Sequence, residues 1–537
     1  MLGRRALIAT GAALGAASSA AAAGKKKGPA PVNAVAETHR GKVRGAIHDG
    51  IRVFKGIPYG ASTAGGNRFK APKPPKPWTD VRDALAFGPM APQGSRELAS
   101  VMNSWTFDKD MSEDCLVLNV WTPALRDQRK RPVMVWFHGG GFGSLSGSRN
   151  VFDGTRLCQK GDVVVVTVNH RLNVFGYLYL GHLGGAEFAE SGNAGMLDLV
   201  AALRWVHDNI AEFGGDPANV TIFGQSGGGA KVSTIMAMPQ ARGLFHKAIV
   251  QSGSHLEGLT PDEATKHAAA LMAALGLKPN DTLKLRALPM DTILAGMKKI
   301  MAAPGPKPNF SPVVDQYILP KNPWLPDGPA VSAAVSAAVP MMIGTTRTET
   351  TLLIGAGDPA TFELDEAGLR QKLAAWVPER DVGRVVEGFR KLQPNATPSD
   401  LFFAVTTDRR VRQQAWIQAE RKAAQNGGAV WLYEVDWATP VEGGKWRSPH
   451  SLELAFVFDN VAKSEAMVGT GAAPQAMADR MSTAWLAFAR TGNPGWAPFK
   501  PADRATMVFD TTSRVVNDFR GDERAVLASL PVYRVNR

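Results

Sequence analysis

The sequence predicts an α/β fold, because its clearest apolar runs are typical of buried strands that lead into glycine-rich turns and helices. Residues 220–223 are apolar and β-branched, and residues 228–236 after the turn follow a helical pattern that ends before Pro239. Residues 132–137 form a second apolar run before a triple-glycine loop, and strand-like segments follow near 339–344 and at 429–435. Strands that alternate with helices in this way favour a large, mostly parallel sheet flanked by helices.

The turn after residues 220–223 is the most informative segment of the chain. It reads Gly224-Gln225-Ser226-Gly227-Gly228, a G-x-S-x-G pattern in which a serine stands on a sharp turn between a strand and a helix. Small residues on both sides are needed because a bulky neighbour would collide with the strand or the helix. We therefore predict that Ser226 is a catalytic nucleophile; the alternative is a glycine-rich turn that carries a solvated serine.

A loop upstream provides candidate hydrogen-bond donors for the negative charge that such a nucleophile would create. The run 132–137 is followed by His138-Gly139-Gly140-Gly141, and consecutive glycines allow backbone amides to approach a ligand closely. We assign an oxyanion hole to the N–H groups of Gly140, Gly141 and Gly227. The alternatives are a flexible loop or a phosphate cradle, but the Lys-Ser/Thr or G-x-G-x-x-G that a phosphate site requires does not follow.

Elimination identifies the base. The expected chain order is serine, acid, histidine, and only His246, His255, His267 and His450 follow Ser226. The first enters another apolar strand, and the next two come too early to leave room for a strand that bears the acid. His450 lies on a loop shortly after the strand-like residues 429–435 and is the predicted base, since imidazole titrates near neutrality.

The predicted acid is Glu349, which follows the strand that begins near Val339 and would orient the imidazole. Two rivals remain at this stage. Asp315 is more typical of a turn-closing aspartate, and Glu453 of a carboxylate at a helix N-terminus.

With these motifs, the chain resembles the type-B carboxylesterase family, which includes cholinesterases and bacterial para-nitrobenzyl esterases. The resemblance runs from Gly41 to about Phe499 and implies an α/β-hydrolase fold with helical lid insertions over the serine. It also implies that Ser226, Glu349 and His450 form the triad and that Arg68 and Glu113 form a structural ion pair. The matching motifs lie in residues 54–59, 68–69, 113–121, 193–198, 205–206, 209–210, 213–217 and 488–494.

The chain departs from the family pattern at four positions near these residues. The family elbow usually reads Gly-Glu-Ser-Ala-Gly, and here Gln225 and Gly227 replace the glutamate and the alanine. The residue after the acid is usually glycine but is Thr350, and the residue after the histidine is usually glycine but is Ser451. Gln225 removes a buried charge, and Gly227 keeps its N–H but loosens the turn.

The function that follows is hydrolysis of a small carboxylic ester through an acyl-enzyme. An amidase or peptidase on the same fold is one alternative, although no extra acid for an amine leaving group is evident. A non-catalytic binding protein on an esterase scaffold is another, and the filled triad positions argue against it. The resemblance does not identify the acyl or alcohol specificity or the oligomeric state.

The N-terminus predicts export. Residues 1–23 combine Arg4-Arg5 with an alanine-rich apolar stretch and a small-residue end, as in a signal peptide of the twin-arginine type. The alternative is an uncleaved membrane anchor. Residues 24–37 are expected to be a flexible linker and residues 38–537 the catalytic domain. We expect a periplasmic or extracellular enzyme that has no membrane association after cleavage.

The two cysteines are Cys115 and Cys158. Family members commonly bond the signature cysteine to one just upstream, where this chain has Ala91, so the resemblance implies that Cys115 is a buried free thiol. A Cys115–Cys158 disulfide is the less favoured alternative, since an exported protein can form one. No Cys/His cluster has metal-ligand spacing, and we expect no metal and no cofactor.

The formal net charge is +13, and part of it is concentrated between residues 40 and 82. A solvated basic surface is the simplest explanation. A sharper hypothesis is that the positive field steers anionic esters to the site. Nucleic-acid binding is not expected, because no recognition motif or aromatic ladder accompanies the charge. The basic residues are Arg40, Lys42, Arg44, Arg52, Lys55, Arg68, Lys70, Lys73, Lys76 and Arg82, against Asp49 and Asp80.

Overall fold

The computed structural model describes residues 33–94, 99–106, 110–326 and 329–534. In this part of the chain 13 strands form one sheet, whose order is β1-β2-β3-β5-β7-β6-β8-β9-β10-β11-β12-β13, with β4 beside β2. The strands are β1 (Asn33–Thr38), β2 (Gly41–His48), β3 (Ile51–Pro58), β4 (Arg82–Asp83), β5 (Val117–Thr122), β6 (Arg131–Phe137), β7 (Val164–Val168), β8 (Gly215–Gln225), β9 (Lys247–Gln251), β10 (Met341–Thr346), β11 (Val430–Val435), β12 (Thr506–Phe509) and β13 (Arg514–Val516).

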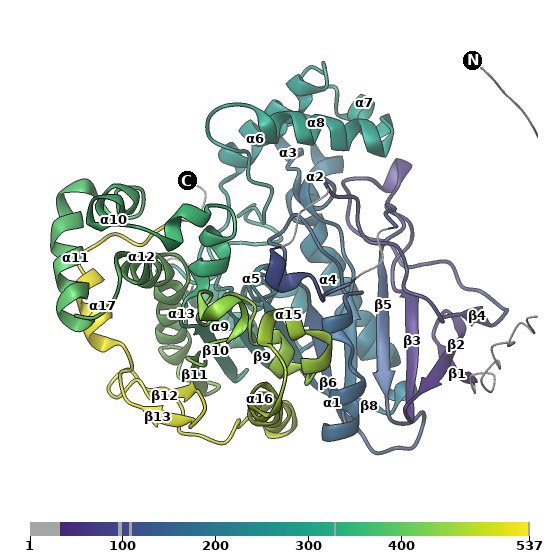
Figure 1. Ribbon diagram of the computed structural model, residues 1–537. Helices are drawn as coiled ribbons and strands as arrows, with labels where there is room; N and C mark the ends of the chain where they lie inside the picture. The colour runs from purple at the N-terminus through teal and green to yellow at the C-terminus, as the bar shows by residue number, and fades with distance from the viewer. Residues whose placement is uncertain (1–32, 95–98, 107–109, 327–328, 535–537) are drawn as a thin grey trace, which may run out of the picture.

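Helices pack against the sheet and extend beyond one end of it (Figure 1). They are α1 (Thr155–Gly161), α2 (Asn173–Tyr177), α3 (Gly181–Gly184), α4 (Ala194–Asn209), α5 (Gly227–Ile235), α6 (Pro261–Ala274), α7 (Thr282–Ala287), α8 (Met290–Ala302), α9 (Pro329–Ser336), α10 (Glu366–Leu373), α11 (Glu379–Leu392), α12 (Pro398–Thr407), α13 (Gln413–Ala423), α14 (Leu454–Val457), α15 (Glu465–Val468), α16 (Ala472–Thr491) and α17 (Gly521–Leu527).

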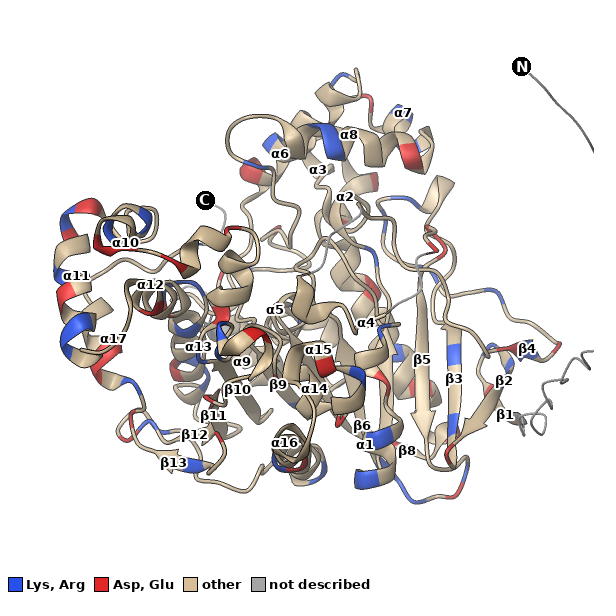
Figure 2. Ribbon diagram, in the orientation of Figure 1, with Lys and Arg blue, Asp and Glu red and all other residues tan. Residues whose placement is uncertain are grey.

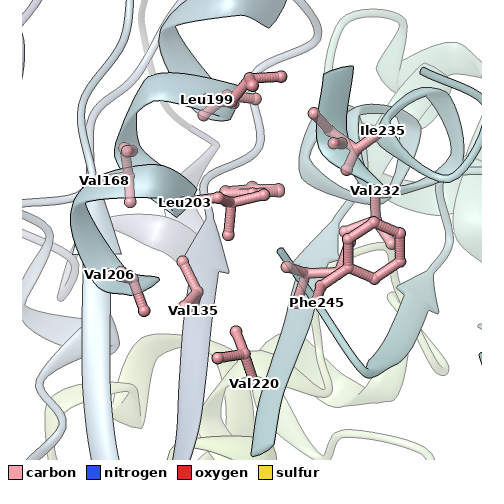
Figure 3. Close-up of a cluster of buried hydrophobic side chains, with 14 of the residues drawn as sticks. Val135, Val168, Leu199, Leu203, Val206, Val220, Val232, Ile235 and Phe245 are labelled. Atoms are coloured by element: carbon pink, nitrogen blue, oxygen red, sulfur yellow. The ribbon is translucent and has the colours of Figure 1, made fainter. Parts of the chain in front are cut away.

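The centre of the sheet is parallel and buried on both faces, as the continuous apolar strand runs predict. Along β6, Val133 and Val135 belong to one hydrophobic cluster, while Met134 and Trp136 belong to another. The first cluster contains side chains of α4 and α5 (Figure 3) and of α13, and the second contains those of α1, α14 and α16. Because side chains alternate along a strand, one apolar run supplies both layers of the core.

Two smaller helical groups pack around apolar clusters of their own. Helices α6 and α8 pack with α2 and α3 around their own apolar cluster, and α10, α11, α12 and α17 form a second one. In Figure 1 the first group stands above the sheet and the second lies at its left. Both groups are therefore packed extensions of one α/β core.

The predicted boundary between linker and catalytic domain needs a correction. Residues 33–37, assigned to the linker, belong to β1, which pairs antiparallel with β2 from Asn33 opposite Ala46 to Thr38 opposite Gly41. The reason is burial, because Ala34 and Ala36 point into the core. The predicted signal peptide, residues 1–23, and the rest of the predicted linker lie outside the described residues.

Cys115 and Cys158 are both buried free thiols and belong to different hydrophobic clusters. Burial raises the pKa of each thiol far above its usual range. Within the described ranges no helix has the length and apolar character needed to cross a bilayer.

Several basic residues of the 40–82 segment have carboxylate partners. Arg44 pairs with Asp83 and Lys70 pairs with Glu187, each at 2.5 Å on the surface. Figure 2 shows acidic segments beside basic ones along β2 and β4. These contacts neutralise part of the positive charge that the sequence concentrates here.

The parallel strands bring the predicted site residues to one edge of the sheet. β6, β8, β10 and β11 run in the same direction, since the pairs β6·β8, β8·β9, β9·β10 and β10·β11 are all parallel. The carboxyl end of β6 leads into the triple-glycine loop, and that of β8 leads into Ser226. Glu349 follows β10 by three residues, and His450 lies on the connection after β11. Ligand sites of open α/β sheets form at this edge.

The ion pair implied by the family resemblance is present. The Arg68 guanidinium donates to both carboxylate oxygens of Glu113, at 2.6 and 2.5 Å, and both side chains are buried. Arg68 also donates to the carbonyls of Arg286 and Leu288, at 2.6 Å each. This residue therefore ties the end of α7 to the loop before β5.

We predict that Glu113→Gln lowers the free energy of unfolding by about 3–5 kcal/mol, because it leaves a buried guanidinium without its counter-charge. Asp83→Asn is the matched control, since it removes the exposed partner of Arg44 and should cost less than about 1 kcal/mol. Urea denaturation followed by tryptophan fluorescence measures both. Equal midpoints for the two variants would contradict the structural role of the buried pair.

Candidate active site

Ser226 has the strained backbone of a nucleophile elbow. Its φ is 58° and its ψ is −125°, between the end of β8 and the start of α5, and its N–H donates to Gln251 O at 2.8 Å. The turn is tight enough to exclude side chains on its neighbours. A Cβ on Gly224 would lie 2.4 Å from the carbonyl carbon of Gly228, and one on Gly228 would lie 1.9 Å from Phe137 O. The glycines are therefore required by the approach of helix to strand.

The three predicted oxyanion donors lie around this elbow. Gly140 and Gly141 both have positive φ, 83° and 60°, and a Cβ on Gly140 would lie 2.3 Å from Ser144 O. A Cβ on Gly227 would lie 2.2 Å from Gly141 O and 2.4 Å from Gly141 N, so the loop rests directly on the elbow. Among the described hydrogen bonds none uses the N–H of Gly140, Gly141 or Gly227. All three donors are uncommitted.

Glu349 and His450 contact each other directly. His450 Nδ1 is 2.5 Å from Glu349 Oε2, and both side chains are buried. The other carboxylate oxygen accepts the Thr346 N–H at 2.8 Å, which fixes the carboxylate at the end of β10. An imidazole held in this way donates from Nδ1 and presents Nε2 as an acceptor.

The His450 ring contacts the side chain of the residue before the serine. Gln225 Nε2 lies 3.2 Å from His450 Nε2 and 3.5 Å from His450 Nδ1, so the amide lies against the ring and is not in line with the Nε2 lone pair. No hydrogen bond joins the Ser226 hydroxyl to the ring among the described residues. In free enzymes the hydrogen bond from nucleophile to base is often long and tightens only with substrate. The structure thus brings Glu349 to His450 and brings the residue adjacent to Ser226 to the same ring.

Two of the four departures from the family pattern contact each other. The Ser451 hydroxyl donates to Gln225 Oε1 at 3.1 Å, from a backbone with a φ of 73° that the usual glycine would adopt without strain. The Gln225 amide is therefore oriented by Ser451 at one end and meets His450 at the other. Thr350, the third departure, is buried, and its hydroxyl bonds Thr406, Thr407 and Phe403 O.

Neither rival acid is hydrogen-bonded to His450 among the described residues, where the partner of Nδ1 is Glu349. Asp315 Oδ1 accepts the N–H groups of Tyr317, Ile318 and Leu319, at 2.7–3.0 Å, and so closes a turn as predicted. Glu453 is fully buried and precedes α14. Burial and the negative charge of Glu349 raise the pKa of Glu453 to about 8, so its carboxyl group is mostly protonated at neutral pH.

The other histidines after Ser226 lie elsewhere. His246 Nδ1 accepts the Val220 N–H at 3.1 Å, and His267 Nδ1 lies 2.8 Å from Asn309 O. His255 is bonded to the Thr234 hydroxyl at 3.0 Å, and burial lowers the pKa of His255 to about 4. None of them contacts Glu349 in the described structure.

A cavity of about 620 Å³ reaches the predicted oxyanion loop, residues 138–142, at Gly141 and Phe142. Leu256, Leu259 and Leu325 give it an apolar lining, and the C-terminal residues Val532 and Tyr533 form part of its wall. Such a cavity can accommodate an apolar acyl or alcohol group. Within the described residues, no three His, Cys, Asp or Glu side chains gather as metal ligands.

Sequence reasoning did not identify one buried group beside the site. Lys231 lies in α5 with no exposed surface, and its Nζ contacts carbonyls of the oxyanion loop. The available signal was a lone charge in the predicted helix 228–236, where every neighbour is small or uncharged.

The chain matches known proteins over nearly its whole length. The model of the carboxylesterase family matches residues 32–525, beyond both ends of the resemblance noted from motifs. The chain is 35% identical to the para-nitrobenzyl esterase of Bacillus subtilis, with 92% of this chain and 98% of the relative covered. It is 31% identical to the phenmedipham hydrolase of Pseudarthrobacter oxydans, with 92% and 99% covered.

Solved structures of similar proteins point to the same family. A carboxylesterase of Geobacillus stearothermophilus superposes with a TM-score of 0.79 at 37% identity, covering 92% of this chain and 99% of the other. A para-nitrobenzyl esterase structure gives 0.78 at 34% identity, with the same coverage. The chain belongs to the carboxylesterase family and is a carboxylic ester hydrolase with the α/β-hydrolase fold.

Proposed function

We propose that the chain hydrolyses esters through an acyl-enzyme on Ser226, with His450 as general base and Glu349 as its orienting acid. The observation that carries this is the 2.5 Å contact of His450 Nδ1 with Glu349, on loops that end beside the serine elbow. A buried carboxylate at Nδ1 fixes the tautomer and stabilises the imidazolium that forms when Nε2 takes a proton.

The steps follow from these positions. His450 Nε2 accepts the hydroxyl proton while Ser226 Oγ forms a bond to the ester carbonyl carbon. The oxyanion accepts hydrogen bonds from Gly140, Gly141 and Gly227. The intermediate collapses as the C–O bond to the alcohol breaks, and the alcohol oxygen takes the proton from His450. Water then repeats the sequence on the acyl-enzyme and releases the acid.

The Gln225 amide has a place in this cycle. In the free protein it lies beside Nε2 of His450, the atom that must receive the Ser226 proton. Because the amide lies against the ring near both nitrogens, it can support the imidazole while Nε2 accepts the serine proton. In this arrangement Gln225 contacts the imidazole and Ser451 orients the amide.

The two alternative functions have less support. Amide hydrolysis would need stronger protonation of the leaving group, and a non-catalytic binding protein would not need a strained serine beside uncommitted amides. A preference for anionic esters and export to the periplasm or beyond both stay predictions. The name of the Bacillus relative supports a para-nitrobenzyl ester as the first assay substrate.

Ser226→Ala should reduce ester turnover to below about a thousandth of the wild-type rate, because the acyl acceptor is lost. A fluorophosphonate probe should label the wild type and leave this variant unlabelled. Ser513→Ala, on the hairpin between β12 and β13, is the control and should keep both activity and labelling. Substantial turnover by a folded Ser226→Ala variant would exclude the serine mechanism.

Gln225→Ala should lower kcat by about threefold to tenfold, the effect of one to two hydrogen bonds. Ser451→Ala should lower it less, because its hydroxyl acts through Gln225. The double variant should match Gln225→Ala alone, since removal of the amide leaves Ser451 without its acceptor. Steady-state kinetics of the three variants measure this coupling. Additive losses would show that the two side chains act separately.

A further inference from the structure

Lys231 is a fully buried lysine directly beneath the oxyanion loop. Its Nζ donates to His138 O at 2.9 Å and to Gly141 O at 2.8 Å. It also lies 5.6 Å from the centroid of the Phe142 ring. Among the described residues no carboxylate pairs with it. Lysine is almost never fully buried without a counter-charge, so this placement is costly.

The two carbonyls that Lys231 binds bracket the oxyanion donors. His138 O belongs to the peptide group before Gly139, and Gly141 O belongs to the one before Phe142. Between them lie the two peptide groups that carry the N–H of Gly140 and of Gly141. One side chain therefore fixes both ends of the segment that must present these amides.

The two hydrogen bonds from Lys231 to the loop carbonyls can form whether its amine is charged or neutral. Burial lowers the pKa of Lys231 to about 7. His138 and His170 stack at 5.0 Å nearby, and burial together with the Lys231 charge holds the pKa of both rings well below the usual range, so they are neutral. A neutral amine still has two N–H donors, as many as the carbonyls it serves.

Gly227 completes the arrangement from the elbow side. An alanine methyl, which the family elbow usually carries here, would lie 2.2 Å from Gly141 O and 2.4 Å from Gly141 Cα. On the far side of the loop, the Asn173 N–H donates to Phe142 O at 2.7 Å, and its side chain donates to Gly143 O at 3.2 Å. The loop is therefore held close to the elbow at a distance that only glycine permits.

We propose that Lys231 is a positioning residue for the oxyanion hole, which holds the glycine loop against Gly227 so that the three amide N–H groups converge on one point. This inference rests on the proposed function, because it concerns the hole that would stabilise the Ser226 intermediate. A displacement of such donors by about 1 Å can cost about 100-fold in rate.

Lys231→Met tests the inference, since it keeps the length of the side chain and removes both donors. We expect kcat to fall about 10- to 100-fold with KM within about threefold. Affinity for a trifluoromethyl ketone, which forms an oxyanion on the serine, should fall by the same factor. Affinity for the product alcohol should not change, because it places no charge in the hole.

Lys422→Met is the matched control. Lys422 is also fully buried and donates to two backbone carbonyls, Ala337 O at 2.9 Å and Gly428 O at 3.4 Å, but between α9, α13 and β11. The Lys422→Met variant should be less stable than the wild type but should keep its kcat and its affinity for the ketone. If Lys231→Met does not fold, Lys231→Gln replaces it, because the shorter amide cannot reach both carbonyls. The test is then the same, namely kcat and ketone affinity relative to wild type.

Gly227→Ala gives an independent route to the same displacement. Its methyl should push the loop outward, with a comparable loss of kcat and ketone affinity. The double variant with Lys231→Met should be close to the worse single variant, since both move one loop.

Unchanged kcat and ketone affinity in a folded Lys231 variant would overturn the inference, as would additive losses in the double variant. Failure of the proposed function has a different signature, because wild-type protein would then not react with a fluorophosphonate.

Discussion

The backbone at residue 226 is held in a region that costs a non-glycine residue about 1–3 kcal/mol, and the close approach of helix α5 to the sheet keeps it there. Gly228 meets Phe137 O, and a Cβ on Gly253 would lie 2.0 Å from Ser226 O. The turn is thus enclosed by β6, β8 and the segment after β9. The other groups of the candidate site lie near Ser226, because the glycine loop after β6, Glu349 after β10 and His450 after β11 are at the same edge of the sheet.

Burial sets the charges around that point. Glu349 and His450 are removed from water together, and the carboxylate receives a backbone N–H as well as the imidazole. A second carboxyl group, Glu453, lies close enough for the Glu349 charge to raise its pKa, and it is mostly neutral at pH 7. On the opposite side Lys231 faces carbonyl dipoles and neutral imidazoles. Two ionised carboxylates side by side would be costly here, and protonation of one removes that cost.

Much of this could be predicted from the sequence. The order of strand, glycine turn and helix identified Ser226, and chain order with elimination led to His450 and Glu349, which the structure brings into contact. The α/β class followed from apolar strand runs. Other features could not be predicted, because they depend on contacts between distant segments. Ser451 and Gln225 are 226 residues apart, and nothing local indicates that their side chains meet. The start of β1 was missed because Ala34 and Ala36 are small and give a weak strand pattern.

The departures from the usual family residues are best understood as contacts. Gln225 contacts both the Ser451 hydroxyl and the His450 imidazole, so the amide that replaces a carboxylate has a hydroxyl to orient it. Because Gly227 has no side chain, the loop that contains Gly141 can lie against it. Lys231 donates hydrogen bonds to two carbonyls of this loop, His138 O and Gly141 O. The flexibility that Gly227 adds to the turn is offset by the hydrogen bonds from Lys231 to the loop. A glycine at 227 alone would loosen the predicted oxyanion hole. Lys231, four residues later on the same helix, counters this because its buried amine binds two carbonyls of the loop.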